Sequence, residues 1–313
     1  MAMITLPSVL GLGLTLTAAA AERGWQWRET TSPHFAVSHE MPWMPPGFII
    51  TLEKMHGRLR MDLGMFSPWM AKERIKLFLY KDQKSYLAGE FEPPQWSNGI
   101  AIYDMKAVAV PDNPADRKTL QRVISHETTH LLFEGYWKEA GKHPPTWLNK
   151  GLAMMEEADV PDRPERLAWF QAMVYATPES LLPLPQFFEI NPTKDLSNKD
   201  TIGNWYVQAY SLVYFLYRGN SRLQFKNFCS RLRDGKELED GLWFAYRYRD
   251  IKALEKAWRA WLARAEHKKR VDAARAMEAA SASGSSAEAE KPRRHNFAPT
   301  TITPMKGFKS LRE

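Results

Sequence analysis

Cysteine is almost absent from this sequence, and so are long apolar runs. The single cysteine, Cys229, cannot form an intramolecular disulfide, which excludes a disulfide-stapled miniprotein; its surroundings predict a helix in which it is a small buried hydrophobe. Beyond the N-terminus no segment is long and apolar enough to span a bilayer. At 313 residues, 44% of them hydrophobic, the chain is neither disordered throughout nor collagen-like. It is long enough for one large domain or two small ones, and it has no internal repeat.

Most of the chain also has little excess of one charge over the other. The net charge of +7 suggests a polyanion partner, but from His267 onward there are ten basic and five acidic residues, so this end carries +5 and the remainder only +2. The Ala- and Ser-rich run 279–287 has few large apolar groups to bury. We therefore expect residues 267–313 to form a disordered basic tail. Because that tail has no aromatic interleaving beyond Phe297 and Phe308, we expect no nucleic-acid partner.

The one long apolar stretch lies at the N-terminus. Residues 4–17 are uncharged and largely apolar, and four alanines, residues 18–21, precede the first charged residues. This pattern is typical of a secretory signal peptide, residues 1–21, cleaved near Ala21. No positive residue precedes the stretch, so an uncleaved membrane anchor is the alternative, although about 18 residues with Pro7 are marginal for a span. We expect an exported protein, periplasmic or secreted.

Alternation of apolar residues predicts a small mixed β-sheet in the first half of the chain, about residues 30–135. The Asn98-Gly99 turn signal precedes a strand whose hairpin partner follows it. The expected strands are 32–38, 75–80, 100–103 and 107–110, with helices at 47–65 and 85–91.

Helical periodicity dominates the second half, about residues 136–266. A helix is predicted from Pro114 to Glu134, with Asp112-Asn113 as the capping segment before a proline at the first helical position. The further expected helices are 146–157, 165–176, 205–217, 222–232, 238–246 and 251–265. Most of the twelve tryptophans, such as Trp258 and Trp261, are predicted to be core residues. The fold class is therefore α+β, with one folded domain over residues 22–266 whose helical lobe follows the sheet.

The predicted helix from Pro114 contains the pattern His126-Glu127-Thr128-Thr129-His130. Histidines at i and i+4 project from one helix face and can bind one zinc ion, while the glutamate between them can take a proton from a metal-bound water. We therefore expect His126 and His130 as metal ligands and Glu127 as general base. A catalytic zinc normally has a third protein ligand, which must come from elsewhere.

The segment Trp147-Leu148-Asn149-Lys150-Gly151-Leu152-Ala153 resembles the Trp-Leu-Asn-Glu-Gly-hydrophobic-Ala segment of gluzincin metallopeptidases. The order of elements over residues 30–265, with Tyr206-Val207-Gln208 and the Trp258-Arg259-x-Trp261-Leu262 ending, is similar to the peptidase MA-like family of exported bacterial proteins. The resemblance implies a zincin-like fold, one zinc ion per chain and a peptide or protein substrate. It also implies that the third zinc ligand is a glutamate at the position of Lys150.

Lys150 departs from the family pattern at that ligand position. A charged ammonium has no lone pair for zinc, and it repels the ion. Glu157 lies on the same helix face but about 10 Å along the helix rise, too far for a simple exchange. Glu134, Glu139 and Asp159 are further carboxylates whose positions the sequence does not define.

Three alternatives follow from Lys150. In the first, His126, His130 and a substitute carboxylate or an extra water hold zinc, and peptidase activity persists in weakened form. In the second, the Lys150 ammonium occupies the place of the metal and pairs with Glu127, which gives a pseudopeptidase that binds peptides or a partner protein. In the third, Lys150 points to solvent and the two histidines bind metal weakly. The chemistry of lysine favours the second and third, and the intact His-Glu-x-x-His pattern favours the first. We therefore expect an exported zinc metallopeptidase-like protein that hydrolyses peptide bonds with Glu127 as general base, and the pseudopeptidase is the alternative.

Supporting residues follow from the same resemblance. Tyr206, with Tyr210 one turn later, matches a tyrosine that would stabilise the oxyanion formed by water attack on a carbonyl. Glu157 would orient a ligand histidine through its second ring nitrogen. The strand 107–110 is expected beside the cleft, where an extended peptide could pair with it. His143 is expected at the surface, in a proline-containing loop.

Overall fold

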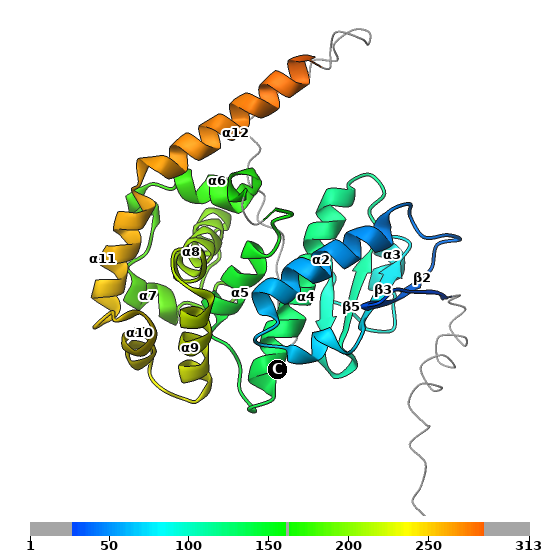
Figure 1. Cartoon of the computed structure of the whole chain (residues 1–313), viewed down its shortest axis with the longest axis horizontal. Coiled ribbons are helices and arrows are strands. Elements are labelled where there is room, and N and C mark those ends of the chain that lie inside the picture. The colour runs from blue at the N-terminus through cyan, green and yellow to red at the C-terminus, as the bar shows by residue number, and fades with distance from the viewer. Residues whose placement is uncertain (1–26, 161–162, 285–313) are drawn as a thin grey trace, which may run out of the picture.

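The computed structural model describes residues 27–160 and 163–284 (Figure 1). The expected signal peptide and the end of the expected tail, residues 285–313, lie outside these ranges. Within the described ranges no helix is both long and apolar enough to cross a membrane. The fold is α+β, with a small mixed sheet in the N-terminal half and a mostly helical second half, as the sequence predicts.

The sheet has five strands in the order β1-β2-β3-β5-β4. Its centre is parallel, and the two edge strands β1 and β4 are antiparallel to their neighbours. The strands are β1 (Arg28–Thr31), β2 (Phe35–His39), β3 (Ile75–Tyr80), β4 (Ile100–Ile102) and β5 (Ala107–Pro111). The predicted hairpin of β4 and β5 is confirmed. The expectation that the second hairpin strand borders the cleft is wrong, because β5 pairs on both sides and the free edge belongs to β4.

The two faces of the sheet bury different side chains, because side chains alternate along a strand. On β3, Leu77 and Leu79 belong to the main core, which includes residues of α2 (Phe48–Leu63) and α4 (Arg117–Lys138). Tyr80 belongs to a smaller cluster on the opposite face with Tyr86 of α3 (Gln83–Leu87). Two short 3-10 helices, η1 (Pro68–Ala71) and η2 (Tyr103–Met105), lie in this half. Strand β1 was not expected from the sequence because its Arg28 and Glu29 are exposed and show no apolar alternation.

Helix α4 begins later than the sequence predicts. Asp116 is its N-cap and accepts a hydrogen bond from the backbone N–H of Thr119 at 3.0 Å. The Asp112-Asn113-Pro114 segment therefore precedes the helix. An acceptor side chain at the N-cap satisfies one of the free N–H groups of the first turn, and this decides where the helix starts.

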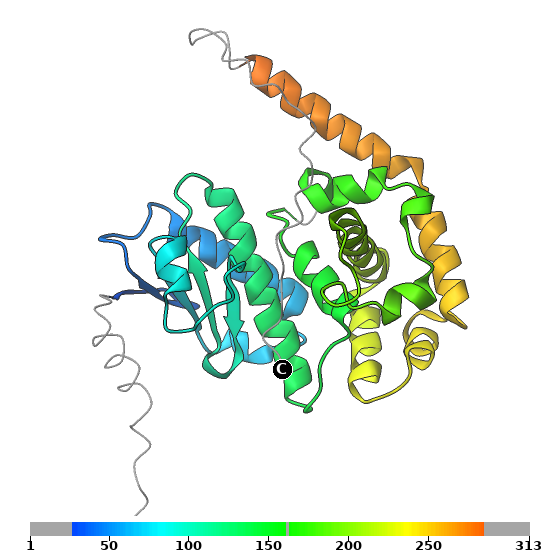
Figure 2. The same ribbon diagram turned by 180° about the vertical axis from the view of Figure 1, so that it is seen from behind.

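Helix α8 (Lys199–Arg218) is the centre of the second half (Figures 1 and 2). It contacts α5 most extensively and also contacts α6, α9 and α11. The other elements are α5 (Thr146–Met155), η3 (Pro164–Arg166), α6 (Ala168–Tyr175), η4 (Pro178–Ser180), α7 (Leu184–Glu189), α9 (Arg222–Arg233), α10 (Leu238–Tyr246), α11 (Ile251–Leu262) and α12 (Ala265–Gly284). The sequence did not predict α7, a helix of six residues with a proline in its first turn.

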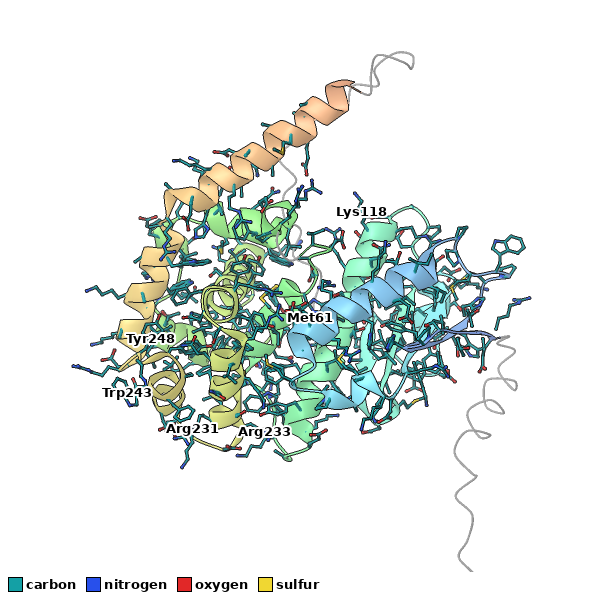
Figure 3. The ribbon with its side chains drawn as sticks, viewed as in Figure 1. Met61, Lys118, Arg231, Arg233, Trp243 and Tyr248 are labelled. Carbon is teal, nitrogen blue, oxygen red and sulfur yellow. The ribbon has the colours of Figure 1, made fainter. Side chains whose placement is uncertain are left out.

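Burial of the larger aromatic residues agrees with the predicted core. Trp258 and Trp261 are buried, and Cys229 is a fully buried free thiol. Trp243 on α10 is instead about half exposed and lies at the surface of the helical half (Figure 3).

Gly151 allows α5 and α8 to approach closely. A Cβ atom at this position would lie 2.4 Å from the backbone oxygen of Ala209 and 2.5 Å from Cγ2 of Val213. Only glycine permits that approach. Helix α5 also contacts α4.

Residues 267–284, expected as the start of a disordered tail, are helical. Val271 of α12 is fully buried, Arg270 forms an ion pair with Glu165 at 2.9 Å, and Tyr175 donates a hydrogen bond to Asp272 at 2.7 Å. The folded part therefore continues past residue 266 because α12 has partners on η3 and α6.

Candidate functional site

The histidines of α4 converge on one point. His126 and His130 are one helical turn apart, and their Nε2 atoms lie 3.2 Å from each other. Both residues and Glu127 are almost fully buried. The i, i+4 spacing therefore brings the two ring nitrogens together as the sequence predicts.

His126 is held through its other nitrogen by Glu157, which lies just after the C-terminal end of helix α5. Its Nδ1–H donates to Oε1 of Glu157 at 2.8 Å, and Oε2 of Glu157 accepts a hydrogen bond from the indole of Trp169 at 3.1 Å. Glu157 thus contacts a histidine in the manner expected for an orienting carboxylate, which fixes the ring and leaves Nε2 facing the site.

His130 is held by a residue that the sequence analysis did not single out. Its Nδ1–H donates to Oδ1 of Asn149 at 2.9 Å, and the Asn149 amide donates to Glu134. Asn149 directly precedes Lys150. This place beside the expected third-ligand position is the one sequence feature that could have marked Asn149 as a site residue. Glu134 lies near the same ring nitrogen, with its Oε1 3.9 Å from His130 Nδ1.

Burial keeps both imidazoles neutral. It lowers the pKa of His126 against the opposing effect of Glu157, and it lowers the pKa of His130 well below its ordinary value, with Lys150 adding to the effect. Because each Nδ1–H is committed to an acceptor, each Nε2 carries a lone pair. Two lone pairs 3.2 Å apart favour a cation or a hydrogen-bond donor between them.

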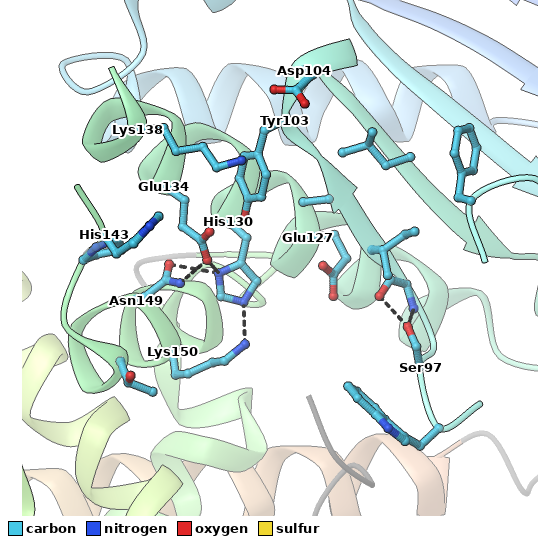
Figure 4. Close-up of a pocket in the computed structure, with 18 residues that line it drawn as sticks. Ser97, Tyr103, Asp104, Glu127, His130, Glu134, Lys138, His143, Asn149 and Lys150 are labelled. Atoms are coloured by element: carbon cyan, nitrogen blue, oxygen red, sulfur yellow. Dashed lines mark hydrogen bonds and ion pairs between the residues drawn. The ribbon is translucent and has the colours of Figure 1, made fainter. Parts of the chain in front are cut away.

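Lys150 supplies such a donor. Its side chain is buried, with only 7% of the residue exposed, and its Nζ lies 3.2 Å from Nε2 of His130 (Figure 4). The alternative in which Lys150 points to solvent is therefore wrong. Helix register explains this, since Lys150 lies on the side of α5 that faces α4 while Gly151 faces α8.

Glu127 lies in the same enclosed region. Its Oε1 is buried and accepts no hydrogen bond from any residue in the described ranges. Burial raises its pKa to about 8, although Lys150 counteracts that rise. Burial likewise lowers the pKa of Lys150, against the attraction of Glu127 and Glu134. The two groups therefore stabilise each other's charged forms in a site that penalises both.

These residues border a cavity of about 500 Å³ between the sheet edge and α5 (Figure 4). Strand β4 and η2 form one wall, α4 the floor, and α5 with its preceding loop the other wall. Gly99 brings the chain before β4 close to Glu127, because a Cβ there would lie 3.0 Å from Glu127 Cγ and 2.9 Å from Val123. The cavity is lined by Phe91, Trp96, Ser97, Gly99, Ile100, Ala101, Ile102, Tyr103, Asp104, Glu127, His130, Glu134, Lys138, His143, Pro144, Thr146, Asn149 and Lys150.

Other predicted residues lie elsewhere. Tyr206 and Tyr210 are buried on α8 and are not among the residues that line the cavity. Glu139 and Asp159 are exposed and also lie outside it. His143 is exposed, as expected, but it borders the mouth of the cavity.

The donor set meets only part of the requirement for a catalytic zinc. Two nitrogens bound to a tetrahedral zinc at about 2.0–2.1 Å would lie about 3.3 Å apart, close to the observed 3.2 Å. The third position holds Lys150, and the carboxylates of Glu157 and Glu134 lie on the Nδ1 sides of the rings. Within residues 27–160 and 163–284 no group of three or more His, Cys, Asp or Glu side chains is arranged to hold a metal ion. The residues present do not fit a zinc with three protein ligands.

Comparison with known proteins agrees with this geometry. No curated protein matches the sequence. The family model described as "Peptidase MA superfamily" matches residues 59–264, which include α4, α5 and α8. The match covers more than half of the chain and contains the whole histidine-bearing site, so this peptidase-like protein belongs to the Peptidase MA superfamily.

Proposed function

We propose that this chain is a pseudopeptidase, a peptide-binding member of its superfamily whose hydrolytic centre is replaced by Lys150. The observation that carries the proposal is the 3.2 Å separation between Lys150 Nζ and His130 Nε2. Members of the superfamily are generally zinc-dependent, and their third zinc ligand is expected at this position. An amine at that point removes the carboxylate ligand and adds a positive charge where a divalent cation would bind.

Lys150 also satisfies the groups that a metal would otherwise satisfy. Its N–H donates to the His130 lone pair, and its positive charge opposes the rise in the pKa of Glu127 that burial causes. The attraction between Lys150 and Glu127 offsets part of the cost of burying both groups, so no ion is needed to lower that cost. In this proposal Glu127 interacts electrostatically with Lys150 and has no activated water to deprotonate.

The cavity suits an extended peptide. β4 is an edge strand, and its residues Ile100–Ile102 line the cavity together with Asn149 and Lys150 of α5. A peptide can pair with such an edge through main-chain hydrogen bonds, which give affinity without strong sequence preference. The aromatic side chains of Trp96, Phe91 and Tyr103 add apolar surface along the same wall.

A zinc peptidase of reduced activity is the second candidate. The distance of 3.2 Å between the two Nε2 atoms, together with an intact Glu127, favours it. In that case His126 and His130 would hold one zinc ion per chain, and Glu127 would be the general base. Zinc would supply a polarised water and Lewis-acid stabilisation of the attacked carbonyl.

Incubation with peptides separates the two candidates. The purified chain, supplied with zinc, is mixed with a peptide library, and bound and cleaved peptides are identified by mass spectrometry. The pseudopeptidase predicts retained peptides and no new termini, with the same result for Glu127→Gln. Zinc-dependent cleavage that Glu127→Gln abolishes would overturn the proposal and support the enzyme.

We further propose that the protein is exported, periplasmic or secreted, on the basis of the apolar residues 4–17 and the four alanines that follow. Expression of the full sequence with cell fractionation tests this. Recovery of a shortened chain outside the cytoplasm supports export, and a full-length chain in the cytoplasm contradicts it.

A further inference from the structure

Arg58, a residue outside the cavity, contacts both helices of the site. It lies on α2, 67 and 98 residues away in sequence from its two partners Ser125 and Glu156. Its Nη2 donates to Oγ of Ser125 on α4 at 2.7 Å. Its Nη1 donates to the backbone oxygen of Glu156 at 2.7 Å and to Oε2 of Glu156 at 2.9 Å. One guanidinium therefore joins α4 to the C-terminal end of α5.

The two partners of Arg58 each precede a residue of the site. Ser125 precedes His126, and Glu156 precedes Glu157, the pair whose Nδ1–H to Oε1 hydrogen bond is 2.8 Å long. The Ser125 hydroxyl also donates to the backbone oxygen of Glu156. At the C-terminal end of α5, two neighbouring bridges therefore join it to α4, one made by His126 and Glu157 and the other by Arg58.

The Arg58 bridge is itself buried and braced. The side chains of Arg58 and Glu156 are 13% and 0% exposed. Arg218 of α8 lies 3.5 Å from Glu156 and also pairs with Asp62 of α2. Arg222 reaches Asp62 at 3.1 Å from the outer side of the cluster, where it is 46% exposed. A planar guanidinium with several donors suits this triple contact, whereas an ammonium acts as a point charge.

We infer that Arg58 is a positioning residue that holds Glu157 in hydrogen-bonding register with His126. It acts from α2 by fixing Ser125 and the C-terminal end of α5, and it is not among the residues that line the cavity. The inference deepens the proposed function by naming what sets the geometry of that site, and it applies to the chain with or without metal.

Imidazole NMR of the full chain labelled with ¹⁵N-histidine tests the inference. The readout is exchange with water of the hydrogen-bonded Nδ1 proton of His126. Arg58→Lys keeps the positive charge but loses the planar guanidinium that contacts both partners. We expect the His126 proton to exchange about tenfold faster, because the contact between α4 and the end of α5 opens more often. Arg222→Lys, in the same cluster but without contact to either helix end, is the matched control and should leave exchange unchanged.

The outcomes are separable. If Arg58→Lys lowers stability but leaves the His126 proton unchanged, Arg58 is a purely structural residue and the inference is wrong. If Arg58→Lys does not fold, Ser125→Ala is used instead, because it removes one acceptor of the Arg58 guanidinium. Faster exchange of the His126 proton in that variant then supports the inference, and unchanged exchange overturns it. Neither metal nor peptide enters this measurement, so failure of the pseudopeptidase proposal would leave its result intact.

Discussion

Lys150 Nζ and His130 Nε2 lie 3.2 Å apart in the buried centre of the site, with the amine donating to the ring nitrogen. The relationship joins the His-Glu-x-x-His motif on α4 to the position on α5 where the sequence resemblance predicts the third zinc ligand. A lysine buried in such a place would be costly without partners, and here a neutral imidazole and the carboxylate of Glu127 offset the cost. Under the pseudopeptidase proposal, the peptidase fold is kept while its metal-binding chemistry is altered.

Close packing of α5 on α8 predicts the effect of Gly151→Ala. The added methyl would meet the Ala209 oxygen at 2.4 Å, so the helices must separate, and we expect a loss of about 1–3 kcal/mol in the free energy of unfolding. Gly203→Ala on α8 is the control, since nothing lies within 4 Å of its Cβ, and helix propensity predicts a gain of up to about 1 kcal/mol. Urea denaturation measures both. An equal change in the free energy of unfolding for the two variants would contradict the close packing of α5 on α8.

Burial of Glu156 predicts a pH dependence of stability. Burial raises the pKa of Glu156 from 4.5 to about 7, and the nearby Asp62 raises it further. Arg58 and Arg218 oppose this rise. Arg222 forms an ion pair with Asp62. The folded state then keeps a proton that the unfolded chain releases, so the contribution is full below pH 4.5 and is lost as the pH rises toward 7. The free energy of unfolding of the wild type, relative to Glu156→Gln, should fall by about 3 kcal/mol over that window. A difference that stays constant with pH would count against a raised pKa.

The sequence was sufficient for the parts of the site that depend on local spacing. The i, i+4 spacing brings the two histidines together, and apolar alternation predicts β3 at its observed bounds. The position of Lys150 on α5 also followed from the motif. The direction in which its four-carbon side chain points could not be predicted, because that direction depends on the packing of α5 between α4 and α8.

Contacts between distant segments were beyond sequence reasoning. No local pattern connects Arg58 to Glu156, 98 residues away, and Asn149 was passed over because an amide beside a lysine has no periodic signature. The extension of the fold through α12 depends on ion pairs and burial against η3 and α6, and its alanine-rich composition alone favoured disorder.

Strand β4 predicts where a bound peptide protects the backbone. Hydrogen–deuterium exchange of the chain, with and without a retained peptide, should show slower exchange at residues 100–102 because added main-chain hydrogen bonds cover that edge. The other edge strand, β1, is the internal control and should not change. Slower exchange in β1 alone, or in neither edge strand, would rule out pairing of the peptide with β4 at the cavity wall.

Zinc titration of the metal-free wild type and of Lys150→Glu by calorimetry tests the central claim most directly. The variant restores a carboxylate and removes the opposing charge, so we predict one zinc per chain, bound at least about 100-fold more tightly than by the wild type. His130→Ala in the variant background should abolish that binding. Equally tight binding of one zinc by the wild type and by Lys150→Glu would contradict the assignment of Lys150 as the residue that replaces the metal.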